Sequence, residues 1–155
     1  MTHPKFLAVT IGLLVIAVSI FLYADGRPQG LGIAESRLTP CPTSPNCVSS
    51  DERASKHNIA ALRLKAPAIE VWKAAALSIS AQPGAVIRER TPDYLHAEYT
   101  SAVVGFIDDL ELHLRVSEGI IAVRSASRVG YSDFGVNRQR VEDLRAALIE
   151  QGLVQ

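Results

Sequence analysis

The chain has 155 residues, a length that leaves room for one domain once an apolar leader is set aside. Its 16 basic and 16 acidic side chains cancel, so no overall field draws the protein to nucleic acid, and we expect no nucleic-acid partner. Aromatic residues make up only 6% of the chain and there is a single Trp, which disfavours a surface that stacks bases or sugars.

The first 24 residues predict a membrane anchor. Residues 6–24 are an almost unbroken apolar run that, at ~1.5 Å per helical residue, approaches the ~30 Å hydrocarbon thickness of a bilayer. The alternative is a cleaved secretory signal, but Leu22 stands where a cleavage site needs a small residue. We therefore expect residues 1–5 in the cytoplasm and an uncleaved transmembrane signal anchor at 6–24. Lys5 lies on the positive flank, which places the rest of the chain outside the cytoplasm.

Residues 25–58 are rich in Gly, Pro and Ser, which predicts a tether followed by an ordered loop. This segment contains both cysteines of the chain, Cys41 and Cys47. On an exported domain their close spacing favours a disulfide that closes a small proline-stiffened loop. Free or redox-active thiols are one alternative. A metal site is another, although only Asp51 and His57 lie near enough to add ligands.

Residues 59–152 carry the pattern of one small domain, which begins with a short strand at 61–65. Pro67 then suits the first turn of a helix. The helix ends at Gln82-Pro83-Gly84, and its spacing predicts a buried face formed by Ile69, Trp72, Ala76 and Ile79.

Four strands are expected next, in two hairpins. Residues 85–90 and 94–100 predict two strands joined by a tight turn that contains Pro and Asp. In residues 109–116 Leu or Val alternates with charged residues and His, a pattern typical of a half-buried antiparallel strand. A turn at Glu118-Gly119 leads into the strand at 120–128.

A two-residue turn would fix the register of the second hairpin. Asp109 would then face Arg128, and Leu112 and Leu110 would meet Ser125 and Ser127, so that two hydroxyls point to the apolar side. A bulge at Gly119 would shift this register.

A final helix should follow Gly135 and run to about Gln151, with Val141, Leu144 and Leu148 as its buried stripe and Asp133 or Asn137 as its N-cap. The predicted order is therefore β-α-β-β-β-β-α. Strands that run together between two helices indicate an α+β fold, here an antiparallel sheet of about five strands with the helices packed on one face.

Three segments of the chain, PCPTSPNCVSS at residues 40–50, GFIDD at 105–109 and RSASRVGYSDFGVNR at 124–138, resemble the signature blocks of the domain of unknown function 1499 family. The resemblance extends roughly from Leu38 to Leu148. It implies a bacterial envelope protein, with relatives in plastid-bearing lineages, and it implies no activity. Together with the anchor it predicts a single-pass protein of the bacterial inner membrane with a periplasmic domain.

Basic and hydroxyl side chains gather around the start of the final helix. Free amides at a helix N-terminus, beside guanidinium groups and hydroxyls, suit a phosphate or carboxylate. The competing interpretation is a structural ion-pair network with Asp108, Asp109 and Asp133. The candidate ligand-binding residues are Arg124, Ser125, Ser127, Arg128, Asn137 and Arg138, with Ser132 and Arg140 in the same span.

The sequence assigns no catalytic residue, no metal site and no cofactor. A serine nucleophile at Ser125 or Ser127 would need His113 or His96 as its base, and no spacing requires such a pair. We therefore expect a non-enzymatic envelope module that contacts the membrane through its anchor and binds a lipid or an anionic metabolite. The alternatives are a hydrolase or transferase, and a structural partner in an envelope complex, which would expose a contiguous apolar patch.

Overall fold

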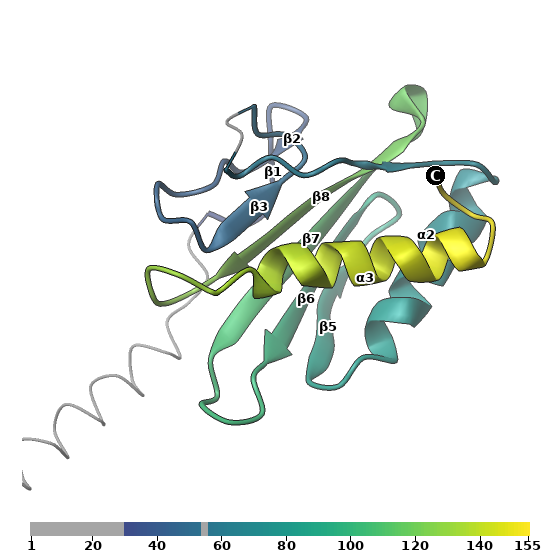
Figure 1. The fold of residues 1–155 in the computed structure, drawn as a ribbon. Helices are drawn as coiled ribbons and strands as arrows, with labels where there is room; N and C mark the ends of the chain where they lie inside the picture. The colour runs from purple at the N-terminus through teal and green to yellow at the C-terminus, as the bar shows by residue number, and fades with distance from the viewer. Residues whose placement is uncertain (1–29, 54–55) are drawn as a thin grey trace, which may run out of the picture.

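A computed structural model describes residues 30–53 and 56–155, and it shows an antiparallel sheet packed against two helices (Figure 1). The predicted α+β class is confirmed. The elements in chain order are β1 (Ile33–Ala34), β2 (Arg37–Leu38), β3 (Cys47–Ser49), β4 (Leu62–Arg63), α2 (Ala68–Ser80), β5 (Ala85–Arg90), β6 (Tyr94–Thr100), β7 (Ile107–Arg115), a 3-10 turn (Val116–Glu118), β8 (Ile120–Ser127) and α3 (Val136–Glu150).

The main sheet has six strands in the order β3-β8-β7-β6-β5, and β4 pairs with β8 beside β3. It therefore has one strand more than the five expected. The added strand is β3, which comes from the Cys-containing segment and pairs Cys47 with Ala126. A strand of three residues is too short for alternation to be visible in the sequence, and it exists because β8 offers it a free edge.

The apolar core lies between one face of the sheet and both helices. The predicted stripe of α3, Val141, Leu144 and Leu148, is fully buried. In α2 the prediction is partly wrong, because Ile69 is 58% exposed and Val71 and Ala75 are buried in its place. The helix thus presents a stripe rotated slightly from the expected one. Each large aliphatic side chain buried in this layer contributes about 1.5–3 kcal/mol.

The register of the β7–β8 hairpin differs from the expected one by two residues. Arg115 pairs with Ile120, so the connection has four residues: the 3-10 turn and Gly119, which lies in the left-handed region at φ 65. Glu111 consequently faces Arg124, and Leu110 faces Ser125. Because side chains alternate with a period of two, the shift changes each partner but leaves every side chain on its expected face.

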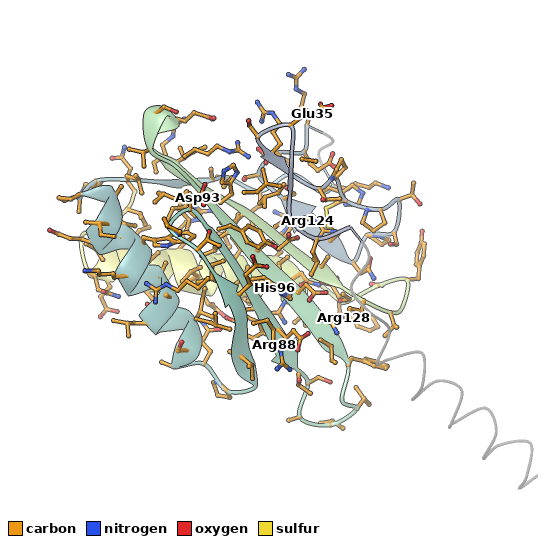
Figure 2. The ribbon with its side chains drawn as sticks, turned by 180° about the vertical axis from the view of Figure 1, so that it is seen from behind. Glu35, Arg88, Asp93, His96, Arg124 and Arg128 are labelled. Atoms are coloured by element: carbon orange, nitrogen blue, oxygen red, sulfur yellow. A yellow bond between two sulfur atoms is a disulfide. The ribbon has the colours of Figure 1, made fainter. Side chains whose placement is uncertain are left out.

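The second face of the sheet is charged, and the chain between residues 30 and 53 lies over part of it. The amide of Gly32 donates to Glu111 Oε1 at 2.6 Å, and Leu38 packs in a small cluster with Tyr94 and Ala122. Figure 2 shows this face with His96, Arg124 and Arg128 on it. Charged side chains on it are therefore largely shielded from solvent.

At the free edge of the sheet, β5 is irregular. Its pairing with β6 shifts between Ile87 and Glu89, which makes Arg88 an extra residue in the edge strand. Gly84, just before this strand, has φ +74, and a Cβ there would lie 2.5 Å from the carbonyl oxygen of Thr100. The turn from α2 into β5 therefore requires glycine at this position.

No helix among residues 30–53 and 56–155 is long and apolar enough to cross a membrane. The anchor expected at residues 6–24 lies outside the described residues.

The expected disulfide is present, with Cys41 and Cys47 joined by an S–S bond of 2.03 Å. Cys47 is buried in β3, so the bond fixes the loop that precedes this strand to the edge of the sheet.

Removing the disulfide should lower the free energy of unfolding. For a loop of this length the chain-entropy model gives about 2 kcal/mol. We expect that difference between the wild-type protein and the Cys41→Ser/Cys47→Ser variant in urea denaturation under oxidising conditions. The two proteins should become equally stable after reduction. A difference that persisted after reduction would assign the loss to packing of the substituted side chains.

Candidate functional site

The structure divides the sequence-predicted site residues between the two faces of the sheet. Arg124 and Arg128 lie on the charged face, whereas Ser125 and Ser127 point toward α3. Arg138 lies on the outer side of α3, where it donates to the backbone oxygens of Lys56 and Asn58. Alternation along β8 is the cause of this division, because neighbouring residues of a strand cannot share a face.

Arg124 belongs to a buried group at the centre of the charged face. Its Nη1 donates to Glu111 Oε2 at 2.7 Å, and the Tyr94 hydroxyl donates to Glu111 Oε1 at 2.8 Å. Burial together with the Glu111 carboxylate raises the pKa of Tyr94, which keeps this hydroxyl protonated as a donor. Arg124 Nε is buried and has no hydrogen-bond partner among the described residues.

Arg128 belongs to a second group on the same face. It donates to both oxygens of Asp109, at 2.8 and 2.9 Å, and also to Glu98. His96 Nε2 lies 2.7 Å from Asp109 Oδ1. Burial alone would raise the pKa of Asp109, but the hydrogen bonds from His96 and Arg128 outweigh it and hold the pKa below its usual value. The hydrogen bonds to Asp109 and Glu98 in turn raise the pKa of Arg128.

His96, Glu98 and Asp109 place one ligand atom each within 4.8 Å of one another, which is a spacing that could hold a metal ion. Both carboxylates are already bound, however. Arg128 donates to Glu98 and Asp109, and Arg88 donates to Glu98 from the other side. Two guanidinium groups neutralise the two carboxylates, so a divalent cation would have to displace them.

A third ion pair closes the charged face near the opposite end of β7. Asp51 accepts from both terminal nitrogens of Arg115 and from the amide of Leu38. Burial alone would raise the pKa of Asp51. The hydrogen bonds from Arg115 and Leu38 and the positive charges of Arg115 and Arg37 outweigh burial and lower this pKa. Burial and the Arg115 guanidinium lower the pKa of His113, which favours its neutral form.

On the helix face, Asn137 is the centre of a hydrogen-bond network at the start of α3. Its Oδ1 accepts from Ser125 at 2.6 Å and from Arg140 at 2.6 Å, and its Nδ2 donates to Ser127 at 2.9 Å. Asp133 accepts from the backbone amides of Gly135 and Asn137, as expected for a capping carboxylate, although Gly135 occupies the N-cap position itself. These amides outweigh the effect of burial and lower the pKa of Asp133.

Arg140 extends this network to the wall of a groove of about 490 Å³. Its guanidinium carbon lies 4.4 Å from the centre of the Tyr99 ring, and it donates to Asp108 Oδ2 at 2.7 Å and Ser125 Oγ at 3.0 Å. The Tyr99 hydroxyl is buried without a hydrogen-bond partner among the described residues, and burial raises its pKa to about 12. The groove lies between the end of α2 and the start of α3 and is lined by Gln82, Pro83, Tyr99, Val136, Gln139, Arg140 and Asp143.

Sequence reasoning located the start of α3 but did not select Tyr99 or Arg140 as site residues. Arg140 lies three residues after Asn137 and so on the same helical face, which is a signal the sequence contains. Tyr99 offers no such signal, since its position beside Arg140 depends on the pairing of Tyr99 with Asp108 across two strands.

The serines and the imidazoles proposed as catalytic partners lie on opposite faces of the sheet. Ser125 is bonded to Asn137 and Arg140, whereas His96 and His113 lie on the face that carries Glu111. The arrangement therefore does not form a serine–histidine pair at Ser125 or Ser127.

Breaking the Glu111–Arg124 pair should be strongly destabilising. Glu111→Gln leaves a buried guanidinium without an anion, and we expect a loss of about 3–5 kcal/mol in urea denaturation. The Glu111→Leu/Arg124→Leu variant should recover most of that loss, because no buried charge remains. If the double variant is no more stable than Glu111→Gln, the unpaired buried charge is not the source of the loss in stability.

Asp109 should make stability depend on acid pH. Its folded pKa lies below the usual value of 3.8, so its contribution is complete above that pH and is lost as the pH falls through the folded pKa. At neutral pH Asp109→Asn should cost about 2 kcal/mol, because hydrogen bonds to a charged group are lost. Below about pH 4 its stability should fall less steeply than that of the wild type. Parallel pH profiles for the two proteins would contradict this assignment.

Comparison with known proteins identifies a family and nothing closer. Neither the curated proteins nor the solved structures include a match to this chain. A family profile described as Protein of unknown function (DUF1499) matches residues 37–148, a range that contains the disulfide, the sheet and almost all of α3. The resemblance seen in the three sequence blocks is thereby confirmed, and the chain belongs to this family of proteins of unknown function.

Proposed function

We propose that this protein is a non-enzymatic module of the bacterial envelope, anchored in the inner membrane by residues 6–24, that binds a small amphiphilic ligand with an acidic group. The groove beside Tyr99 and Arg140 is the proposed binding site. One observation carries the proposal: a guanidinium group is held rigidly in the wall of a ligand-sized groove at the N-terminus of α3.

The cation in the groove is preorganised. Asp108, Asn137 and Ser125 fix the Arg140 guanidinium, and the Tyr99 ring supports its flat face. A guanidinium has five N–H donors, so these contacts leave donors for a further acceptor. The start of a helix adds a partial positive charge at the same place. An acidic group would thus meet a fixed donor without first having to order it.

The remaining lining suits an apolar part of the ligand. Pro83, Val136 and the Tyr99 ring provide apolar surface, and Gln82 and Gln139 provide amides. The lining also contains the Asp143 carboxylate, which accepts from Gln139 Nε2 at 2.8 Å. A volume of about 490 Å³ lies within the range of small-molecule sites. Asp108 balances much of the charge of Arg140, so a ligand with one acidic group fits better than a polyanion.

The second candidate function is that of a structural partner in an envelope complex, without a small-molecule ligand. Large apolar side chains are exposed on two loops at one end of the sheet, as expected for an interaction surface. The hydrolase alternative has less support, because the candidate serines and imidazoles lie on opposite faces of the sheet.

Native mass spectrometry of the full chain, extracted from its membrane in mild detergent, tests the groove. We expect the wild type to carry a bound small molecule. Gln139→Trp should lose it, because an indole at this exposed position would fill the groove while leaving Arg140 in place. The mass of the molecule distinguishes a lipid from a soluble metabolite.

Arg138→Ala is the matched control. It removes a guanidinium from the same helix, but Arg138 faces the loop at Lys56 and Asn58 and does not line the groove. Retention of the ligand by this variant and its loss from Gln139→Trp would support the proposed site. A wild-type protein without ligand, or equal occupancy in all three proteins, would refute it.

A further inference from the structure

Two loops at one end of the sheet expose five large apolar side chains. The β6–β7 loop carries Val103, Val104 and Phe106, and the segment between β8 and α3 carries Tyr131 and Phe134. The loops lie at the same end because Ser127, the last residue of β8, pairs with Asp108 near the start of β7. Figure 1 shows both loops there, beside the start of α3.

These side chains are exposed and do not pack in the apolar core. Phe134 is 97% exposed, Val103 94% and Tyr131 77%. Phe134 also adopts φ 54, in the left-handed region that bulky residues rarely occupy. The fold thus directs an aromatic ring into solvent at a cost in backbone energy, which is the kind of strain found where a side chain has an external function.

These two loops carry no free charge. Residues 101–106 contain no ionisable side chain. The segment between β8 and α3 carries two charged groups. The Asp133 carboxylate is occupied by the amides of Gly135 and Asn137. The Arg128 guanidinium is bonded to Asp109 and Glu98. The opposite end of the sheet differs, because its turns carry Asp93 and Glu118. The loops β6–β7 and β8–α3 therefore combine exposed apolar and aromatic side chains with no free charge that would resist burial in lipid.

The tether expected between the anchor and the domain is short. Residues 25–29 separate the predicted span from Gly30, and five residues reach at most about 17 Å. Gly32 is bonded to Glu111, which lies four residues from the start of β7, or about 13 Å along the strand. The tether is therefore long enough to leave this end of the sheet at the membrane surface and too short to hold the domain far from it.

We propose that the loops at residues 101–106 and 129–135 dock on the periplasmic surface of the lipid bilayer, with Val103, Phe106, Tyr131 and Phe134 in the interfacial region. Aromatic side chains favour this region, where an apolar ring and a polar group are both solvated. This inference rests on the membrane anchoring in the proposed function. It also gives the groove a lipid supply, because Val136, which directly follows the second loop as the first residue of α3, lines the groove.

Tryptophan placed at the two ends of the sheet tests the docking. The full chain is reconstituted in vesicles of phosphatidylethanolamine and phosphatidylglycerol as Phe134→Trp, and as Val116→Trp at the opposite end, where the side chain is 65% exposed. The buried Trp72 is common to both proteins, and the unsubstituted chain gives its background. We expect brominated lipids to quench Phe134→Trp several-fold more than Val116→Trp, and aqueous iodide to show the reverse order. Val103→Trp should behave as Phe134→Trp does.

Equal lipid quenching at the two ends would overturn the docking proposal. A second result would also overturn it: brominated lipids do not quench Phe134→Trp, and its emission is blue-shifted only at a high ratio of protein to lipid. That result would assign the loops to a contact with a second copy of the chain. Alkaline carbonate extraction, which tests whether the chain stays in the membrane, distinguishes failure of the docking proposal from failure of the predicted anchor. A chain that stays in the membrane while its loops remain in water refutes only the docking, whereas an extracted chain refutes the anchor and the docking that rests on it.

Discussion

The carboxylate of Glu111 is the constraint on which the charged side of this domain depends. Glu111 is 0% exposed at the centre of the sheet, and a buried carboxylate is destabilising unless charges and hydrogen bonds compensate it. Its partners come from three separate parts of the chain: Arg124 on β8, Tyr94 on β6 and the backbone of Gly32. Satisfying this one group therefore joins neighbouring strands and holds the segment around Gly32 against the sheet.

The same pairing decides which part of the molecule is available for chemistry. On the charged face, Arg128 and Arg88 neutralise Asp109 and Glu98, and Arg115 neutralises Asp51. A dense set of ionisable groups would otherwise suggest a catalytic or metal centre, but here the groups satisfy each other. The Arg140 guanidinium lies on the other face, in the wall of the groove and over the Tyr99 ring. The binding proposal therefore concerns the helix side of the sheet.

The sequence was sufficient for the two helices and for the strands after residue 60, but not for the short strands before it or for the strand pairing. Strands at 85–90 and 94–100 and the helix after Gly135 follow from local patterns and match the structure to within a residue. The register of β7 with β8 depends on the length of a turn, and the 3-10 turn at Val116–Glu118 carries no clear turn signal other than Gly119. The strand β3 was missed because three residues cannot show a period.

For the site, nearness in sequence was mistaken for nearness in space. Arg124, Ser125, Ser127 and Arg128 are close along the chain, but the alternation of a strand sends the two arginines and the two serines to opposite faces. Asn137 was selected from its place at the start of the helix, but its contacts with both serines appear only in the structure. The place of Tyr99 could not, because it depends on the register of β6 with β7.

The edges of the sheet have a consequence for how copies of this protein meet. One edge is completed by two short strands, since β3 and β4 share the outer side of β8. At the other edge, β5 is interrupted by the extra residue Arg88 and carries Glu89 and Arg90 after it. A bulged, charged edge strand is a poor template for a further strand, so the sheet does not continue readily from one molecule into the next. At high local concentration, many copies should therefore remain separate domains rather than form a growing β-structure.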